Sequence, residues 1–127
     1  MQMPMTADDL VVGIFYYLKK NKKTKLTADR EKLHQAFFRA TREYPKIMSV
    51  LSFRNREQFP ESAQLDQALS NLDATSIISR QNLTPRYYHL ENSLDNSYDK
   101  FSKNILINAG IQENDLNNLA VSIKDLL

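Results

Sequence analysis

Residues 61–91 have the sequence ESAQLDQALSNLDATSIISRQNLTPRYYHLE and contain the clearest signals of fold in the chain. Its first part predicts a helix over residues 61–72, because apolar residues recur at helical spacing along one face. Its second part holds two runs rich in strand-forming residues, on either side of a turn-like segment at 81–85. Residues 76–90 are therefore predicted to form a β-hairpin. The apolar face of the helix consists of Leu65, Ala68, Leu69 and Leu72.

Helices are also predicted on both sides of this stretch. Thr6 and Thr27 are suitable N-cap residues, and each is followed by acidic residues in the first turn, where the helix dipole favours negative charge. Pro45 ends the second of these helices, since the residue before a proline is disfavoured in helical conformation. The predicted helices cover about residues 7–20, 28–43, 61–72, 94–109 and 113–126.

The sequence also supports predictions for three further segments. Residues 46–53 fit either a short helix or a buried strand, and the short helix is favoured. Residues 54–60 are predicted to form a polar loop. The helix at 94–109 is expected to bury one apolar stripe and to end at Gly110 in left-handed conformation. The stripe consists of Leu94, Tyr98, Phe101, Ile105 and Ala109.

The composition suits a single, mainly α domain with one β-hairpin over residues 1–127. Of the 127 residues, 42% are hydrophobic and 25% are charged, and a chain of this length can bury one core. The lack of cysteine excludes disulfides, thiolate metal sites and cysteine nucleophiles. Two glycines are too few for a phosphate-binding Gly-rich loop. The longest apolar run, residues 10–18, is too short to span a membrane. We therefore expect a cytoplasmic protein without a membrane partner.

No group of residues forms a recognisable catalytic or metal-binding motif. The two histidines, His34 and His89, lack the spacing of a zinc site. His34 is expected on the exposed side of its helix together with Arg30 and Arg42, and His89 is expected within a strand. We therefore predict a protein without enzymatic activity, with no catalytic residue, metal or cofactor.

Charge is distributed unevenly along the chain. Residues 1–56 carry 12 Lys or Arg against 5 Asp or Glu, whereas residues 57–127 carry 5 against 10. The densest basic run comprises the five lysines at 19–25, which could attract a phosphate backbone or an acidic partner. The alternative is that these lysines only solvate a helix end and interact with its negative dipole.

Residues 61–91 resemble the second half of a bacterial winged-helix domain of the MarR or PadR kind. In those families a recognition helix is followed by a strand, a wing and a second strand. The apolar helix face matches the recognition helix, and Arg86-Tyr87-Tyr88-His89-Leu90 is similar to the Arg-x-Tyr-x-Leu ending of the wing. The chain departs from this pattern at Ser76, where a glycine is usual, and its helix contains no Lys or Arg.

The resemblance implies a DNA-binding regulator, and this is the leading hypothesis. Amides on the exposed helix face could contact adenine edges, while cations of the wing and of the lysine run would contact phosphates. The alternative for the amides is ordinary polar surface. The candidate nucleic-acid-binding residues are Lys19, Lys20, Lys22, Lys23, Lys25, Gln64, Gln67, Asn71, Arg80 and Arg86.

The second hypothesis is a protein-interaction module or accessory subunit on the same scaffold that does not bind DNA. The acidic second half of the chain favours it. DNA binding requires the lysines and the wing arginines to share a face, whereas partner binding predicts an exposed apolar patch involving tyrosines. Winged-helix regulators commonly dimerise through terminal helices, so the resemblance implies a homodimer. The alternative is that the two C-terminal helices close the core of one chain.

Overall fold

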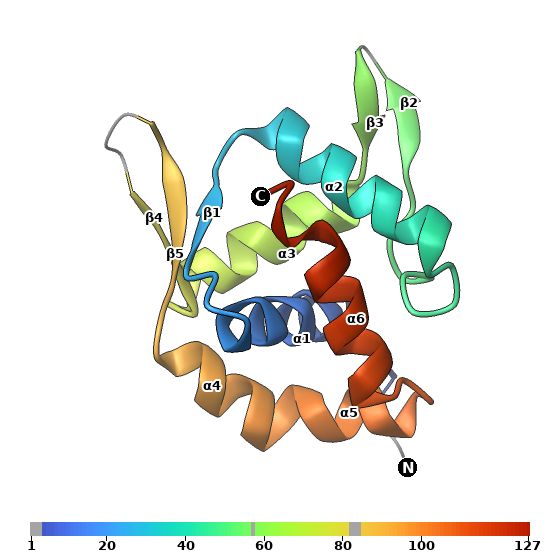
Figure 1. Ribbon diagram of the computed structural model, residues 1–127, viewed down its shortest axis with the longest axis vertical. Helices are drawn as coiled ribbons and strands as arrows, with labels where there is room; N and C mark the ends of the chain where they lie inside the picture. The colour runs from blue at the N-terminus through green and yellow to red at the C-terminus, as the bar shows by residue number, and fades with distance from the viewer. Residues whose placement is uncertain (1–3, 57, 82–84) are drawn as a thin grey trace.

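The computed structural model describes residues 4–56, 58–81 and 85–127, which form a single small mixed α/β domain (Figure 1). The helical segments are α1 (Ala7–Lys20), α2 (Arg30–Glu43), α3 (Ala63–Ala74), α4 (Ser93–Ser97), the π-helix η1 (Tyr98–Ser102), α5 (Lys103–Asn108) and α6 (Glu113–Lys124). The strands are β1 (Lys25–Thr27), β2 (Arg54–Arg56), β3 (Phe59–Glu61), β4 (Ile78–Gln81) and β5 (Tyr87–Leu90). The expectation of one hairpin is wrong, because the strands form two antiparallel sheets.

Helix α1 lies at the centre of the domain, between α3, α6 and the helical segment at 93–108 (Figure 1). A capping box starts it, because the Thr6 hydroxyl accepts a hydrogen bond from the Asp9 N–H and the Asp9 carboxylate accepts one from the Thr6 N–H. All residues at positions 10–15 are buried. The helix therefore has neighbours around almost its whole circumference, as an apolar helix requires.

The larger sheet has the strand order β1–β5–β4. The hairpin predicted at 76–90 is present as β4 and β5, although residues 82–84 of the predicted turn lie outside the described residues. Strand β1, which was not predicted, pairs with β5. Leu26, Ile78 and Leu90 are buried on the inner face of this sheet. Pairing with β5 thus places Leu26 in the core. This pairing joins residues far apart in the chain, so the three residues of β1 alone do not predict the strand.

Left-handed backbone occurs at the exit from α3. Ser76 has a φ of 63°, a conformation that glycine adopts with the least strain. Its N–H donates to the Asp73 carbonyl at 3.1 Å, and its carbonyl accepts from the Ser93 hydroxyl at 2.6 Å. These two hydrogen bonds hold a turn for which a glycine would be the usual residue.

A second hairpin, β2–β3, joins α2 to α3. The prediction of a polar loop at 54–60 is therefore wrong. Aromatic packing holds this hairpin against α2, since the rings of Phe53 and Phe59 lie 6.5 and 6.1 Å from the His34 ring in edge-on arrangements. Such contacts between distant segments leave no periodic pattern in the hairpin itself.

The segment that precedes this hairpin is not helical. Residues 45–50 form turns and 51–53 have no regular secondary structure, so the short helix favoured at 46–53 is wrong. The Met48 N–H donates to the Tyr44 carbonyl and the Leu51 N–H donates to the Met48 carbonyl, both at 3.0 Å. These isolated turn bonds direct Met48 and Leu51 into the core, where a continuous helix would have needed an unbroken ladder of bonds.

A π-helical turn changes which residues of the segment at 93–108 are buried. Core positions recur every four residues, at Leu94, Tyr98, Ser102 and Leu106. A regular helix turns about 100° per residue and would direct Phe101 inward beside Tyr98, but the wider π turn rotates it outward. The predicted stripe is therefore wrong at Phe101 and Ala109, which are exposed, while Ile105 is half-buried.

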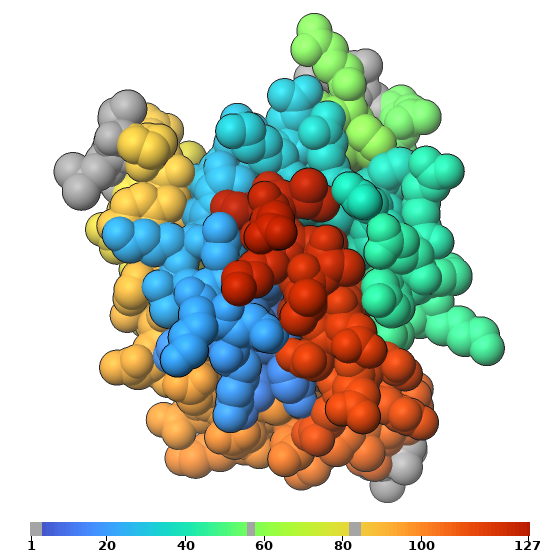
Figure 2. Space-filling model, viewed as in Figure 1, coloured from blue at the N-terminus to red at the C-terminus, as the bar shows by residue number. Residues whose placement is uncertain are grey.

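Helix α6 packs on α1 and α2 and lies across the middle of the face shown in Figure 2. Its buried residues are Leu116, Leu119, Ala120 and Ile123. The apolar stripe of α6 thus closes the core of one chain. This agrees with the alternative given for the C-terminal helices, in which they do not form a dimer interface. A homodimer stays a prediction, and it would have to use residues left exposed, such as Val121 and Leu126. Within the described ranges, no helix is long and apolar enough to cross a membrane.

Close packing at Gly13 is testable by substitution. A Cβ at this position would lie 2.7 Å from Leu106 Cδ1 and 2.8 Å from Leu116 Cδ2. We expect Gly13→Ala to lower the free energy of unfolding by about 1 kcal/mol, because overpacking outweighs the better helix propensity of alanine. Urea unfolding followed by circular dichroism measures this change, and adding Leu106→Val should recover part of it. A Gly13→Ala variant more stable than the parent would contradict the close approach.

Candidate functional site

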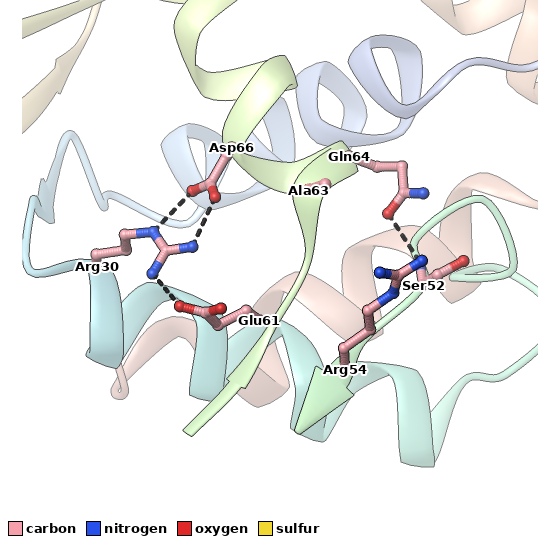
Figure 3. A pocket seen from close by; sticks show the side chains of 7 residues that line it. All are labelled: Arg30, Ser52, Arg54, Glu61, Ala63, Gln64 and Asp66. Atoms are coloured by element: carbon pink, nitrogen blue, oxygen red, sulfur yellow. Dashed lines mark hydrogen bonds and ion pairs between the residues drawn. The ribbon is translucent and has the colours of Figure 1, made fainter. Parts of the chain in front are cut away.

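An ion-pair network joins the start of α2 to β3 and α3. Arg30 of α2 contacts Asp66 of α3 in a bidentate arrangement, with Nε–Oδ1 and Nη2–Oδ2 distances of 3.1 and 2.7 Å. Its Nη1 also donates to Glu61 Oε1 of β3. A planar guanidinium suits such paired contacts with carboxylates. Arg30 is thereby held by two carboxylates from a neighbouring part of the fold (Figure 3).

His34 is fully buried beside this network, although it was expected on the exposed side of α2. Its Nδ1 accepts from the Ser62 N–H at 3.0 Å, and its Nε2 lies 2.8 Å from Asp66 Oδ1. A proton on Nδ1 would face the Ser62 N–H, so this geometry requires a neutral ring with its proton on Nε2. The exposure prediction is wrong because the β2–β3 hairpin covers this side of α2 with Phe53 and Phe59.

The network affects ionisation and positions α3. Although burial raises the pKa of the Asp66 carboxyl, hydrogen bonds from Arg30 and His34 outweigh it and hold that pKa below its usual range. The hydrogen bonds that Arg30 donates to Asp66 and Glu61 also raise the pKa of its guanidinium. Ser62, which donates to His34, is the N-cap of α3 and accepts from the Leu65 N–H. The network therefore fixes where α3 begins.

Two clefts open beside the Arg30–Asp66 pair, and we call them the paired clefts. The first, of about 380 Å³, has Arg54 on the wall opposite the pair (Figure 3). The second, of about 290 Å³, lies between α3 and the inner face of the larger sheet, with Arg80 and Tyr88 on its sheet side. Both clefts contain side chains of both charges. This surface suits polar groups of mixed charge better than a uniformly anionic ligand.

The three candidate amides of α3 already have partners within the chain. Gln64 Oε1 accepts from the Ser52 N–H at 3.2 Å. Gln67 Nε2 donates to Asn71 Oδ1 at 2.9 Å, and Asn71 Nδ2 donates to Asp8 Oδ2 at 3.0 Å. Asn71 uses both its oxygen and its nitrogen in these bonds, and Gln64 and Gln67 each use one of the two, so a bidentate contact with adenine in a duplex would compete with them.

The five candidate lysines surround the end of α1 and the start of β1. Lys19 donates to Asp95 at 2.9 Å, and the Nζ of Lys20 lies 5.3 Å above the centre of the Tyr16 ring. Lys22 is exposed with a φ of 72°, and Lys23 is half-buried. The Nζ of Lys25 lies 4.9 Å above the centre of the Tyr87 ring. Most of this run is thus engaged locally, in keeping with the alternative that it solvates a helix end.

Lys25, the last residue of the lysine run, and Arg80, the first wing arginine, lie on opposite faces of the larger sheet. Lys25 pairs with His89, whereas Arg80 pairs with Tyr88. Neighbouring residues of a strand point to opposite faces, so Lys25 and Arg80 point away from each other. Arg86, just before β5, is exposed. The structure therefore brings Arg80 to the paired clefts and separates it from Lys25.

Sequence reasoning missed the residues that organise this site. Glu61, Ser62 and Asp66 stand within six positions of one another, but their partners on α2 are about 30 residues earlier. The only local signal in the sequence is that the helix carrying Asp66 contains no Lys or Arg. Within the described part of the chain, no three acidic or histidine side chains lie close enough to hold a metal ion.

Comparison with known proteins finds no matching family model, no similar curated protein and no similar solved structure.

The depressed pKa of Asp66 predicts a pH-dependent contribution to stability. We expect Asp66→Asn to lower the free energy of unfolding at pH 7 by about 1 kcal/mol, since charged hydrogen bonds are lost but the carboxylate is partly exposed. The Asp66 pKa in the folded protein lies below the ordinary 3.8, so this contribution is present above that pH and is lost as the pH falls through the folded value. Urea unfolding at pH 7 and pH 3 should give a smaller difference between parent and variant at pH 3.

Asp115→Asn is the matched control, because Asp115 also lies in the first turn of a helix but is exposed. It should lose only the helix-dipole contribution, a few tenths of a kcal/mol. Equal effects of the two substitutions at pH 7 would contradict the assignment of the network.

Proposed function

We propose that this protein is a non-enzymatic binding module of winged-helix topology that recognises a partner protein and not DNA. The order of α3, β4 and β5 agrees with the helix, strand, wing and strand of the families that residues 61–91 resemble. The chain differs from a simple helix-turn-helix, in which three or four residues join the two helices, because the β2–β3 hairpin separates α2 from α3. Folds of this kind serve several functions, so the function has to be inferred from the residues on the surface.

The observation that carries the proposal is the state of the outward side of α3. Its charged residues are the carboxylates Asp66 and Asp73, and the nearest cation, Arg30, is already held by Asp66 and Glu61. A phosphate backbone that approached this helix would meet acidic groups and would gain little from a neutralised arginine. Mixed charge in the paired clefts is suitable for the polar rim of a protein interface.

The separation of the candidate cations supports the same proposal. Lys25 and Arg80 point to opposite faces of the larger sheet, so one duplex lying against one face could not contact both. The affinity of proteins for DNA depends on the number of phosphates that they neutralise together.

Double-stranded DNA is the second candidate, and one observation favours it. Arg80 and Arg86 are exposed at either end of the segment that joins β4 to β5, where a wing would contact phosphates. A transcription regulator of the winged-helix kind would use these two residues and not the lysine run.

Titration of a labelled mixed-sequence duplex separates the two candidates. Fluorescence anisotropy at about 50 mM and 200 mM salt should detect no binding up to about 100 μM protein, which is the weak end of the usual range of nonspecific dissociation constants for DNA. Three results together would overturn the proposal in favour of DNA. Duplex binding would have to fall steeply with salt, be lost in an Arg80→Glu/Arg86→Glu variant and be kept in a Lys22→Glu/Lys23→Glu variant.

A further inference from the structure

The most exposed large apolar side chain of the described residues is Phe101, at 66%. It stands on η1, where the π-helical turn puts the small Ser102 into the core in its place. The Ser102 hydroxyl is satisfied there because it donates to Asp9 Oδ1 at 3.0 Å. Short π-helical turns are rare and are found frequently at functional sites. The backbone thus adopts an uncommon conformation that exposes an aromatic ring.

Phe101 forms one wall of a groove between α1, α3 and η1, which we call the Phe101 groove. Its volume is about 260 Å³. Val12, Leu72 and Ile77 provide an apolar floor, and Leu72 is buried in the core below it. Asp8 and Asp9, at the start of α1, also line the groove, and we call this part of it the acidic end.

The acidic end of the Phe101 groove is not neutralised by cations of the described residues. Asp8 accepts a hydrogen bond from the Asn71 amide, and Asp9 accepts from the hydroxyls of Thr6 and Ser102. Neither carboxylate takes part in an ion pair within the part of the chain that the structure describes. The positive end of the α1 dipole amounts to roughly half a charge, which two carboxylates exceed. This end of the groove is therefore negative.

We propose that the Phe101 groove binds a polypeptide segment of a partner protein that presents an apolar side chain next to a lysine or arginine. The apolar side chain packs between the Phe101 ring and the apolar floor, and the cation contacts Asp8 and Asp9. The Phe101 ring also offers its face to the cation. Nucleic acid does not fit here, because its phosphates would face the two carboxylates. This inference rests on the proposed function and adds a surface and a partner chemistry to it.

Selection from a library of random 12-residue peptides on the full chain supplies the probe. We expect the selected peptides to share a basic residue beside a leucine, isoleucine, methionine or aromatic residue. The best of them, labelled and titrated by fluorescence anisotropy, should bind the Phe101→Ser variant at least about tenfold more weakly, as is typical when an interface anchor is lost. Val121→Ser is the matched control, since Val121 is an exposed apolar residue on α6, and it should leave the affinity unchanged.

Charge is tested with Asp8→Asn, which keeps an acceptor for Asn71 and removes the negative charge. The variant should bind the peptide more weakly, and its binding should depend less on salt than that of the parent. Asp115→Asn, in the first turn of α6, should change neither property. Melting temperatures of all four variants within a few degrees of the parent establish that binding and not folding is affected.

Different results would overturn the proposal about the Phe101 groove and the proposed function. Selected peptides without a basic residue, or peptides that bind Phe101→Ser as well as the parent, would overturn the groove and leave partner recognition in place. A failure to select any peptide would also overturn the groove. Salt-dependent binding of the DNA duplex through Arg80 and Arg86 would overturn the proposed function instead, and it is measured without the peptide.

Discussion

Helix α1 has to be buried on nearly every side, and the arrangement of the other elements depends on this constraint. Its six consecutive buried residues at 10–15 need neighbours around the whole helix. Helices α3, α6 and the segment at 93–108 supply them, and Gly13 lets α5 and α6 approach most closely. The C-terminal helices are thereby committed to the core of one chain. The hairpins and the N-terminal part of α2 remain outside this shell and are available to form surfaces.

Buried polar groups decide the details that apolar burial leaves open. His34 and Ser102 are both buried, and each has a hydrogen-bond partner on another element. No buried side-chain polar atom among the described residues lacks a partner. Because an unsatisfied buried polar group costs about 1 to 3 kcal/mol, these bonds select one placement of α3 against α2 and one rotation of the helix at 93–108. The two surfaces considered above, the paired clefts and the Phe101 groove, both lie next to such a bond.

The sequence predicted what local patterns control. Helices α1, α2, α3 and α6 lie within about two residues of their predicted ends, because caps and apolar periodicity act over a few neighbouring residues. The predicted N-cap Thr6 is confirmed, whereas Thr27 is wrong, because Thr27 lies in β1 and Asp29 caps α2. The hairpin at 76–90 was also found, apart from its turn. Local patterns did not predict three features that depend on partners far along the chain: strand β1, the β2–β3 hairpin and the burial of His34. The nucleic-acid-binding site was predicted less well than the fold. Lys25 and Arg80 can be assigned to faces of the sheet only once the strand register is known.

The π-helical turn has a consequence for how this surface can change over evolutionary time. A π turn contains one residue more than the α-helical turn that it replaces, since its hydrogen bonds run from i to i+5. Loss of the codon for Ser102 would restore the regular helix, with Phe101 three residues after Tyr98 and Leu106 four residues after Phe101, and would turn the aromatic ring toward the core. Homologues with and without that residue would then share the fold and differ in this one contact surface. A length difference of one residue at this position would mark which descendants keep the groove.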